Sequence, residues 1–512
     1  MNSINEKKKL RFLHSIMALF LFAVVNGQVG DPLLFPENAY TTETKIVRTT
    51  RGEKVVVYRS YTHLLYVTKP IDKDYQSLNV SVPVKIDDHE INAADSPILF
   101  VIGVGGYSSV RNNNSSAGDE TTGRQNQPNV SGQRGDFLPS RPGSGPSETS
   151  SLSSRADLAL AAGFVVITPG CRGRENKTPD GTNFGKAPAA IVDLKAAVRY
   201  VKHNKGIIPG NTDHIVSVGV SAGGALSALL GSSGNSPLFD SYLKNIGAAG
   251  GSDDIFASAC FCPITDLENA DGAYEWMYGK VPTRSGLVDQ ELSATLVKKY
   301  IGYQSSLKLL GKDNFGFVTA DNYSGYLLKY YLVPSARKFL DNLNDGKRQE
   351  YLLKNPWLHY SNNELTFSFP DYAAHVGRMK GLPAFDDFEM RQPEPSLFGN
   401  EATDARHFTE FSQQHATGDV KARIDEDIVQ KRNMMNAMYF IENKNSSCAG
   451  HWWIRHGTSD NHTSQTVIIN LALRLENSGK DVNTLLYWDA GHGADEDPGD
   501  FINWILEITS GK

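Results

Sequence analysis

With 512 residues, the chain is long enough to bury a substantial core, so its length is no obstacle to an enzyme. Its 51 Lys and Arg residues stand against 57 Asp and Glu residues, a formal net charge of −6. So mild a charge argues against a nucleic-acid or membrane-surface partner and favours a neutral or weakly charged small molecule.

The first 28 residues predict a secretory signal peptide. A basic cluster at 7–11 precedes an apolar stretch over 16–25, which is followed by small and polar residues. The apolar stretch is shorter than the roughly 20 residues that a membrane-spanning helix needs, and no later segment is long enough. We therefore expect a secreted or periplasmic protein that has no membrane association after signal cleavage. The alternative is an uncleaved membrane anchor.

Six short apolar runs, each bounded by Gly, Pro, Asn or Asp, predict buried parallel strands. Helical patterns lie between them. One follows Pro188, where apolar residues recur three and four apart, and another covers 463–478 and ends before Gly479. This alternation predicts an α/β protein with a mainly parallel sheet covered on both faces. The predicted strands are 97–103, 163–168, 214–219, 255–261, 451–455 and 484–488.

Two segments interrupt the alternation of strand and helix. Residues 108–153 are rich in Ser, Asn, Gly, Pro and Thr, a composition that predicts a flexible surface insertion. Residues 266–430 carry many aromatic and charged residues and several helical patterns but no such alternation, which predicts an inserted cap or lid domain. The expected α/β core therefore has two parts, 29–265 and 431–512.

Four cysteines, at positions 171, 260, 262 and 448, are too few for a disulfide framework in so long a chain. Cys260 and Cys262 belong to a strand-like run, so they should point to the same face as buried thiols. No histidine lies near them in the sequence, which argues against a zinc site. We expect no metal site and no cofactor.

A possible nucleophile follows the third predicted strand. The run HIVSVGVSAGGALSALL places Gly219, Ser221 and Gly223 between a strand and a helix, the context that a GxSxG nucleophile elbow requires. The glycines allow strand and helix to approach closely, and the strained turn lifts Ser221 out of the sheet. The sequence therefore predicts a nucleophilic serine.

Such a serine needs a base to take its proton and an acid to orient that base. In this kind of fold the chain order is Ser, then Asp or Glu, then His, each on a loop after a strand. HWWIRHGTSD supplies Asp460, and LLYWDAGH supplies His492. Competing candidates are Asp489 and Asp495, which flank His492, and His456 and His462, which flank Asp460. We expect a supporting or structural role for Asp489 and a structural one for His456.

An oxyanion also needs hydrogen-bond donors. The N–H of Ala222 lies at the N-terminus of the predicted helix, where the helix dipole favours negative charge. The run PILFVIGVGGY ends the first predicted strand with glycines, and Gly106 is the expected second donor.

Beyond these motifs, the chain resembles bacterial tannases along nearly its whole mature length, apart from the insertion. The resemblance implies an α/β-hydrolase fold and hydrolysis of gallic acid esters through Ser221, Asp460 and His492, the residues already expected from the motifs. It rests on VGGY at 104–107, GKAPAAIVDLKAAVRYVKHN at 185–204, GVSAGGALSALLGSSGNS at 219–236, CPITDLENADGAYEW at 262–276, RMKGLPAFDDFE at 378–389, PEPSLFG at 393–399 and HWWIRHGTSD at 451–460.

The resemblance also implies a substrate pocket. Lys380 and Glu394 would hold the galloyl hydroxyls as donor and acceptor, and Ile264 and Pro393 would clamp the aromatic ring. The chain departs from the family at His462, where tannases have a second aspartate that contacts a galloyl hydroxyl. That departure puts the choice of gallate in doubt.

The function expected from the sequence is therefore a secreted serine esterase that hydrolyses galloyl esters such as tannins, with a small aromatic ester as its partner. An alternative is an esterase for feruloyl or protocatechuoyl esters, which His462 keeps open. A third possibility is a catalytically silent hydrolase-fold binding protein, against which the intact triad argues. The sequence does not predict the oligomeric state.

Overall fold

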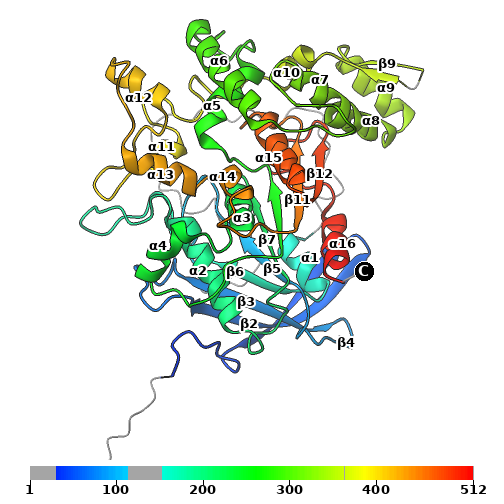
Figure 1. Cartoon of the computed structure of the whole chain (residues 1–512). Coiled ribbons are helices and arrows are strands. Elements are labelled where there is room, and N and C mark those ends of the chain that lie inside the picture. The colour runs from blue at the N-terminus through cyan, green and yellow to red at the C-terminus, as the bar shows by residue number, and fades with distance from the viewer. Residues whose placement is uncertain (1–29, 113–152, 363, 511–512) are drawn as a thin grey trace, which may run out of the picture.

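A computed structural model describes residues 30–112, 153–362 and 364–510 of the chain. Its centre is a ten-stranded sheet with the strand order β1-β2-β3-β6-β5-β7-β8-β11-β12, in which β4 pairs with β3 (Figure 1). The neighbours from β6 to β12 pair in parallel, and the pairs that involve β1 to β4 are antiparallel. The strands are β1 Thr41–Thr49, β2 Gly52–Leu65, β3 Ser77–Ile86, β4 His89–Glu90, β5 Ile98–Ile102, β6 Val165–Pro169, β7 Ile215–Val220, β8 Ala257–Phe261, β11 His451–Gly457 and β12 Asp481–Tyr487.

The parallel strands are β5 to β8, β11 and β12, and each corresponds to one of the six predicted apolar runs. In β5, Ile98, Phe100 and Ile102 belong to one core cluster, whereas Leu99 and Val101 belong to another on the opposite face. A continuous apolar run suits this position because side chains alternate between two buried faces. The predicted α/β-hydrolase fold with a mainly parallel sheet is confirmed.

Helices cover both faces of the parallel strands. Residues of α2 (Ala189–His203), α3 (Ala222–Ser232) and α15 (Gln465–Asn477) pack in the first cluster. Residues of α1 (Arg155–Ala161) and α16 (Pro498–Thr509) pack in the second. The two helices predicted from apolar spacing are α2 and α15, so both are confirmed.

The antiparallel strands β1 to β4 extend the sheet on one side and were not predicted. Their sequences lack continuous apolar runs, because β1 and β2 are exposed at many positions and mix apolar with charged residues. Only β3 is buried along most of its length. It joins the two parts of the sheet by pairing with β2 on one side and β6 on the other.

The segment between β8 and β11 is mainly helical and lies at the end of the sheet where the parallel strands finish (Figure 1). It also holds a short hairpin of β9 (His359–Ser361) and β10 (Glu364–Thr366), which was not predicted. Its helices are α5 Leu267–Tyr278, α6 Gln290–Leu307, α7 Tyr323–Leu327, η4 Leu328–Leu332, α8 Val333–Asp341, α9 Asp345–Lys354, α10 Phe369–Val376, α11 Pro393–Leu397, α12 Glu410–Thr417, α13 Glu426–Met434 and α14 Ala437–Ile441. Between α3 and β8 lie η3 Pro237–Phe239 and α4 Asp240–Asn245.

The start of the predicted surface insertion needs a correction. Residues 108–112 belong to the core region, because Val110 forms a bridge with Cys171 and the buried Asn112 amide donates to backbone oxygens of Ser77 and Thr168. These bonds satisfy polar groups that solvent does not reach. Residues 113–152 and the predicted signal peptide lie outside the described residues.

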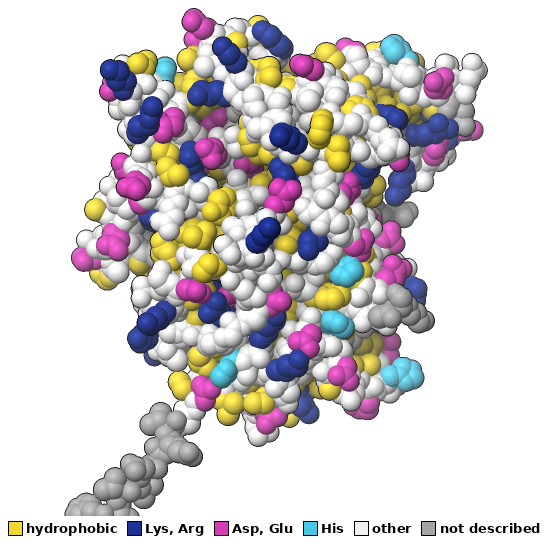
Figure 2. Space-filling model, viewed as in Figure 1, with side chains coloured by type: hydrophobic (Ala, Val, Ile, Leu, Met, Phe, Trp, Pro, Cys, Tyr) yellow, Lys and Arg dark blue, Asp and Glu magenta, His cyan; other side chains and the backbone are white. Residues whose placement is uncertain are grey.

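Acidic and basic side chains are interspersed on the face that Figure 2 shows, in keeping with the mild net charge. Over the described ranges, no helix combines the length and apolar character that a bilayer crossing requires.

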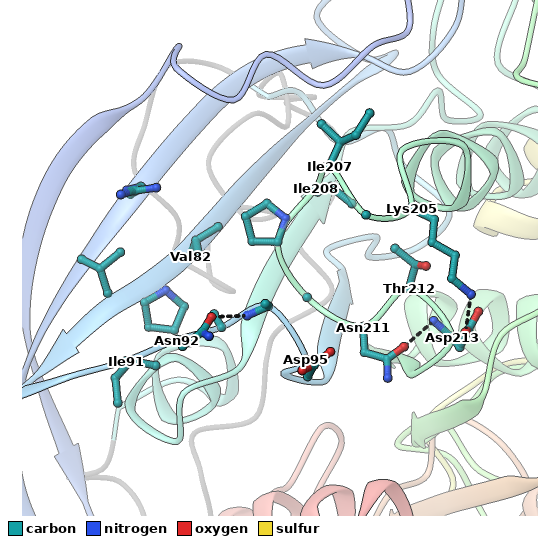
Figure 3. Close-up of a pocket in the computed structure, with 18 residues that line it drawn as sticks. Val82, Ile91, Asn92, Asp95, Lys205, Ile207, Ile208, Asn211, Thr212 and Asp213 are labelled. Atoms are coloured by element: carbon teal, nitrogen blue, oxygen red, sulfur yellow. Dashed lines mark hydrogen bonds and ion pairs between the residues drawn. The ribbon is translucent and has the colours of Figure 1, made fainter.

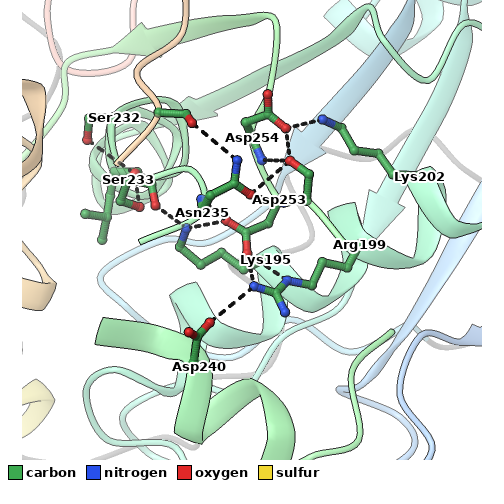
Figure 4. A network of polar contacts seen from close by, with 12 residues as sticks. Lys195, Arg199, Lys202, Ser232, Ser233, Asn235, Asp240, Asp253 and Asp254 are labelled. Carbon is green, nitrogen blue, oxygen red and sulfur yellow. Dashed lines mark hydrogen bonds and ion pairs between the residues drawn. The ribbon is translucent and has the colours of Figure 1, made fainter. Parts of the chain in front are cut away.

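A buried network of charges ties α2 to the loops that follow α3 (Figure 4). Lys195 donates to Asp253 at 2.8 Å and to the Ser233 carbonyl at 2.6 Å. Arg199 donates to the other Asp253 oxygen at 2.8 Å, and the Asn235 N–H also donates to this carboxylate. Each charge in the middle of the network therefore has a direct partner.

Candidate active site

Ser221 occupies a strained turn between β7 and α3. Its backbone has φ 60° and ψ −122°, a conformation that L-residues rarely adopt. A Cβ at Gly219 would lie 2.2 Å from the Gly223 carbonyl oxygen, and one at Gly223 would lie 2.8 Å from the Val104 carbonyl oxygen. Both positions therefore require glycine, and the predicted nucleophile elbow is present with Ser221 half-buried at its tip.

Asp460 and His492 meet at the ends of two neighbouring parallel strands, β11 and β12. His492 Nδ1 lies 2.7 Å from Asp460 Oδ2, a hydrogen-bond distance. Burial alone would raise the pKa of Asp460, but His456 and His492 hold it well below its usual value, so Asp460 is a carboxylate. Burial lowers the pKa of His492, but the hydrogen bond with Asp460 and the contact with Cys262 outweigh it and raise this pKa above 6.5.

The loop that carries His492 lies against the elbow. A Cβ at Gly493 would come within 3.3 Å of Val220 Cγ1, next to Ser221. Among the described residues, no hydrogen bond joins Ser221 Oγ to His492, and His492 Nε2 contacts Cys262 Sγ at 3.9 Å. Catalytic hydrogen bonds are often formed only when substrate is bound, so this geometry is compatible with a serine and its base.

Cys262 follows β8 directly and lies beside the elbow. Val220 pairs with Phe261 in the sheet, and the Ser221 N–H donates to the Phe261 carbonyl at 2.9 Å. No histidine lies near Cys262 in the sequence, but the fold brings His492 to it from the far end of the chain. Cys262 also lies beyond the strand with φ 39°, so strand alternation does not relate it to Cys260.

His456 lies beside Asp460. This buried imidazole has its Nδ1 at 3.5 Å from Asp460 Oδ2, and neither ring nitrogen makes a hydrogen bond. Two competing carboxylates have other partners. Asp489 accepts from Ser459 and contacts His375, and Asp495 forms an ion pair with Arg155.

The two backbone N–H groups predicted as oxyanion donors belong to Ala222 and Gly106. Ala222 begins α3, and Gly106 lies on the loop after β5 with φ 55°. Within the part of the chain that the structure describes, neither N–H donates to another residue. Since the Gly223 backbone lies close to Val104, the loop after β5 approaches the start of α3. The site thus offers donors of the kind that stabilise an oxyanion.

Lys380 and Glu394 form a second pair of charges, and Lys380 lies within electrostatic reach of Asp460. Lys380 Nζ lies 3.6 Å from the centre of the Phe385 ring, and burial lowers its pKa, against the effect of Glu394. Glu394 is buried, which raises its pKa, and its Oε2 has no hydrogen-bond partner. No hydrogen bond joins the two side chains over the described residues, so both have capacity left for a ligand.

His462 stacks on the face of His492, with ring centroids 4.0 Å apart and an angle of 9° between the planes. Burial and the neighbouring His492 lower the pKa of His462 to about 4, so its imidazole is neutral near pH 7. Position 462 therefore holds an uncharged ring that can donate one hydrogen bond and accept another.

Comparisons with solved structures decide the family. A tannase from Fusobacterium nucleatum is 34% identical, with a TM-score of 0.76 over 93% of this chain and 99% of that one. The tannin acyl hydrolase from Lactobacillus plantarum is 32% identical over the same shares, also at 0.76. The chain belongs to the bacterial tannase family.

Two further comparisons support an ester hydrolase. A family model described as BD-FAE, which is an α/β-hydrolase family, matches residues 149–301. Esterase LipQ from Mycobacterium tuberculosis is 34% identical over 100 residues, which are 19% of this chain and 23% of that esterase. This member of the tannase family is therefore a carboxylic ester hydrolase.

The structure places other residues at this tannase-family site that sequence reasoning missed. The hydroxyl of Tyr274, on α5, donates to the Asn461 carbonyl at 3.0 Å and accepts from the N–H groups of Met379 and Lys380. It thus joins the loop of Asp460 to the loop of Lys380. Motif spacing gave no signal for Tyr274 or for Cys262, since both contacts join distant segments.

The two predicted ring-clamping residues lie on different elements. Ile264 is buried, its N–H donates to the Ser221 carbonyl at 3.3 Å, and its carbonyl accepts from the Tyr107 hydroxyl at 2.8 Å. Pro393 is half-buried and begins α11, next to Glu394. Ile264 is therefore attached to the elbow, and Pro393 belongs to the element that carries Glu394.

A separate pocket of about 760 Å³ lies at the opposite end of the parallel strands (Figure 3). Residues 93–95 and 211–213 line it, and they precede β5 and β7, whereas Ser221 follows β7. Its lining includes no Ser, Cys or His, and its ion pair joins Lys205 to Asp213. This pocket therefore lacks the serine and histidine that the predicted triad requires.

Proposed function

We propose that the chain is an exported serine esterase that hydrolyses galloyl esters, with Ser221 as nucleophile, His492 as general base and Asp460 as the acid that orients His492. The observation that carries this proposal is the 2.7 Å contact between His492 and Asp460 beside the strained turn of Ser221. The family relationship and the ester hydrolase activity support it.

In the first half of the reaction, Ser221 Oγ attacks the ester carbonyl carbon while His492 Nε2 takes the hydroxyl proton. Asp460 accepts the Nδ1–H bond, which leaves Nε2 free to act as base and stabilises the imidazolium. The N–H groups of Ala222 and Gly106 hold the oxyanion. His492 then protonates the departing alcohol, and an acyl-enzyme remains. In the second half, water activated by His492 releases the aromatic acid and regenerates Ser221.

The acyl group would lie between the loops that follow β8 and β11 and helix α11. Ile264 and Pro393 would contact the faces of the aromatic ring, and Lys380, Glu394 and His462 would hydrogen-bond its hydroxyls. Structures of related tannin acyl hydrolases hold 3,4-dihydroxybenzoate and ethyl gallate. The unpartnered Glu394 oxygen and the half-buried Lys380 suit vicinal phenols, because they supply an acceptor and a donor.

The test of the nucleophile is Ser221→Ala, assayed with methyl gallate. We expect hydrolysis to fall by at least about 10³-fold, since the remaining donors supply only residual catalysis. Thermal unfolding of the variant should match that of the parent, which controls for loss of fold. Substantial remaining activity would refute the assignment. Failure of a fluorophosphonate probe to label Ser221 in the parent would favour a catalytically silent binding protein.

A second candidate is an esterase for protocatechuoyl or feruloyl esters, which the neutral His462 favours. A ring without charge tolerates a missing or methylated hydroxyl better than a carboxylate that needs a donor. Rates on methyl gallate, methyl protocatechuate and methyl ferulate distinguish the two. Preference for gallate supports the first proposal, and equal or faster hydrolysis of ferulate supports the second.

We also propose export to the periplasm or medium, with residues 1–28 removed and residues 266–430 acting as a cap on a core formed by 29–265 and 431–512. Expression of the full chain in a bacterium followed by N-terminal sequencing of the exported protein tests the cleavage. A mature N-terminus near residue 29 is expected, and a protein retained at the membrane with its N-terminus intact would contradict it.

A further inference from the structure

Cys262, Asp460 and His492 form a cluster that the serine mechanism does not fully use. One ligand atom from each of these residues lies within 4.8 Å of the others. The serine mechanism assigns roles to His492 and Asp460 but none to the buried thiol, whose Sγ lies 3.9 Å from His492 Nε2. A thiol and an imidazole side by side are the soft and intermediate ligands that zinc prefers.

We propose that a soft divalent cation of the zinc class binds between Cys262 Sγ and His492 Nε2 and switches the esterase off. Ordinary Zn–S and Zn–N bonds are about 2.3 and 2.0 Å long, so a tetrahedral angle between them needs the two atoms about 3.5 Å apart. The observed 3.9 Å exceeds this by a distance that a small side-chain rotation covers. The ion replaces the thiol proton, which leaves to solvent.

Asp460 is already placed to support such an ion. A histidine that binds a metal through one ring nitrogen usually donates the N–H of the other to a carboxylate, which fixes the ring and its tautomer. His492 Nδ1 and Asp460 Oδ2 are 2.7 Å apart, on the side of the ring away from Cys262. The contact that prepares His492 as a base therefore also prepares it as a metal ligand.

The cluster offers two protein ligands to the ion directly, which leaves the remaining positions of a tetrahedral centre to water or another exchangeable group. Such a site is occupied reversibly. The His492 side chain is 23% exposed, so an ion can reach it from solvent. Bound metal occupies the Nε2 lone pair, and the base can no longer take the proton of Ser221. The inhibition rests on the proposed serine mechanism, whereas the binding does not.

The test uses the purified full-length protein under reducing conditions and Co²⁺ as a spectroscopic substitute for Zn²⁺. Thiolate coordination gives an intense near-ultraviolet charge-transfer band, and we expect this band to saturate at one ion per chain and to disappear when Zn²⁺ is added. Cys262→Ser and His492→Gln should each weaken binding by about tenfold or more. Cys448→Ser is the matched control, because Cys448 is the only cysteine that is not buried, and it should bind as the parent does.

Zn²⁺ should inhibit hydrolysis of methyl gallate in the parent and in Cys448→Ser with the same concentration dependence as it displaces Co²⁺. A band that persists in Cys262→Ser, or no band in the parent, would overturn the proposal. Binding without inhibition of an active enzyme would overturn the placement of the ion on the base. If the band behaves as expected but the parent hydrolyses no ester, the proposed function fails and the metal site stands. Circular dichroism of each variant checks that loss of binding is not loss of fold.

Discussion

Two lysines, one fully buried and one half-buried, lie next to buried carboxylates in this protein, and their surroundings differ. Lys195 and Asp253 are in direct contact at 2.8 Å (Figure 4). The Lys195 ammonium also donates to the Ser233 carbonyl, and the Asp253 carboxylate also accepts from Arg199 and Asn235. Lys380 and Glu394 are electrostatically coupled, but no hydrogen bond joins them over the described residues. One Glu394 oxygen is buried without any partner.

The difference separates a structural network from a binding site. A buried charge whose hydrogen bonds are all made has no free position for a ligand. Its removal leaves the partner charge buried and uncompensated, which is strongly destabilising. A buried carboxylate with an unused oxygen costs the fold free energy, and that cost is recovered when a hydroxyl donates to it. We therefore expect the first pair to affect stability and the second to affect activity.

The largest effect should come from breaking the satisfied pair. Asp253→Ala leaves Lys195 buried without its carboxylate, and we expect it to lower the free energy of unfolding by about 3–5 kcal/mol. Asp240→Ala is the control, since Asp240 is exposed and lies 3.7 Å from Arg199 in the same network. It should cost less than about 1 kcal/mol. Denaturant unfolding of both variants measures the two losses in the free energy of unfolding. Equal losses would show that the Lys195–Asp253 pair is not a structural network of the kind described.

A substitution in the pair of Lys380 and Glu394, which we call the open pair, should lower activity and not stability. Glu394→Gln keeps the shape of the side chain but removes the charged acceptor, so we expect hydrolysis of methyl gallate to fall by about 10- to 100-fold. Stability should stay the same or rise, because an unpaired buried charge is lost. Methyl benzoate, which has no hydroxyl for Glu394, provides the control rate. A large fall in stability together with an unchanged ratio of the two rates would make this pair structural as well.

Substitution of His462, which lies at the same site as the open pair, tests which side chains determine the choice of acyl group. His462→Asp introduces a second acceptor where family members carry one, and we expect the ratio of gallate to ferulate hydrolysis to rise by about tenfold, or roughly 1.4 kcal/mol. His462→Asn, similar in size but uncharged, is the matched control. A ratio that does not change in either variant would exclude this position from acyl recognition.

A third pair is Asp460 and His492, in which His492 Nδ1 has a hydrogen-bond partner and Nε2 has only the long contact with Cys262. The pH dependence of hydrolysis tests this description. Since Asp460 and Cys262 raise the pKa of His492 above 6.5, and since catalysis needs neutral His492, kcat/KM should increase with pH through a value above 6.5. Cys262→Ala removes one of the raising contacts, so the acid limb should move to lower pH. A limb that stays in place would show that Cys262 does not influence the base. Cys448→Ser should leave the profile unchanged.

The sequence predicted those parts of the molecule that depend on local pattern. Continuous apolar runs identified the six parallel strands, and the glycines around Ser221 identified the elbow, where the structure shows that no side chain fits at Gly219. The order of residues along the chain and their places after predicted strands favoured Asp460 and His492 over their competitors, and the fold brings these two side chains to 2.7 Å. In each case the physical cause lies within a few residues or in the chain order of the fold.

What the sequence did not predict depends on contacts between distant segments. The pairing of Cys262 with His492 spans 230 positions, and the Tyr274 hydroxyl contacts Asn461, 187 positions away. Strands β1 and β2 were missed because their exposed positions break the apolar pattern. The start of the surface insertion was placed too early, because Asn112 is polar in sequence but buried in the fold.

The Tyr274 hydroxyl has a mechanical consequence. The hydroxyl is hydrogen-bonded to the backbones of both Asn461 and Lys380. An ill-fitting acyl group that displaced the loop of Lys380 would therefore also displace the loop of Asp460, which orients His492. A poor substrate would then lose turnover as well as affinity. Such an enzyme would distinguish between substrates through kcat, by way of a tyrosine that contacts neither the ester nor the nucleophile.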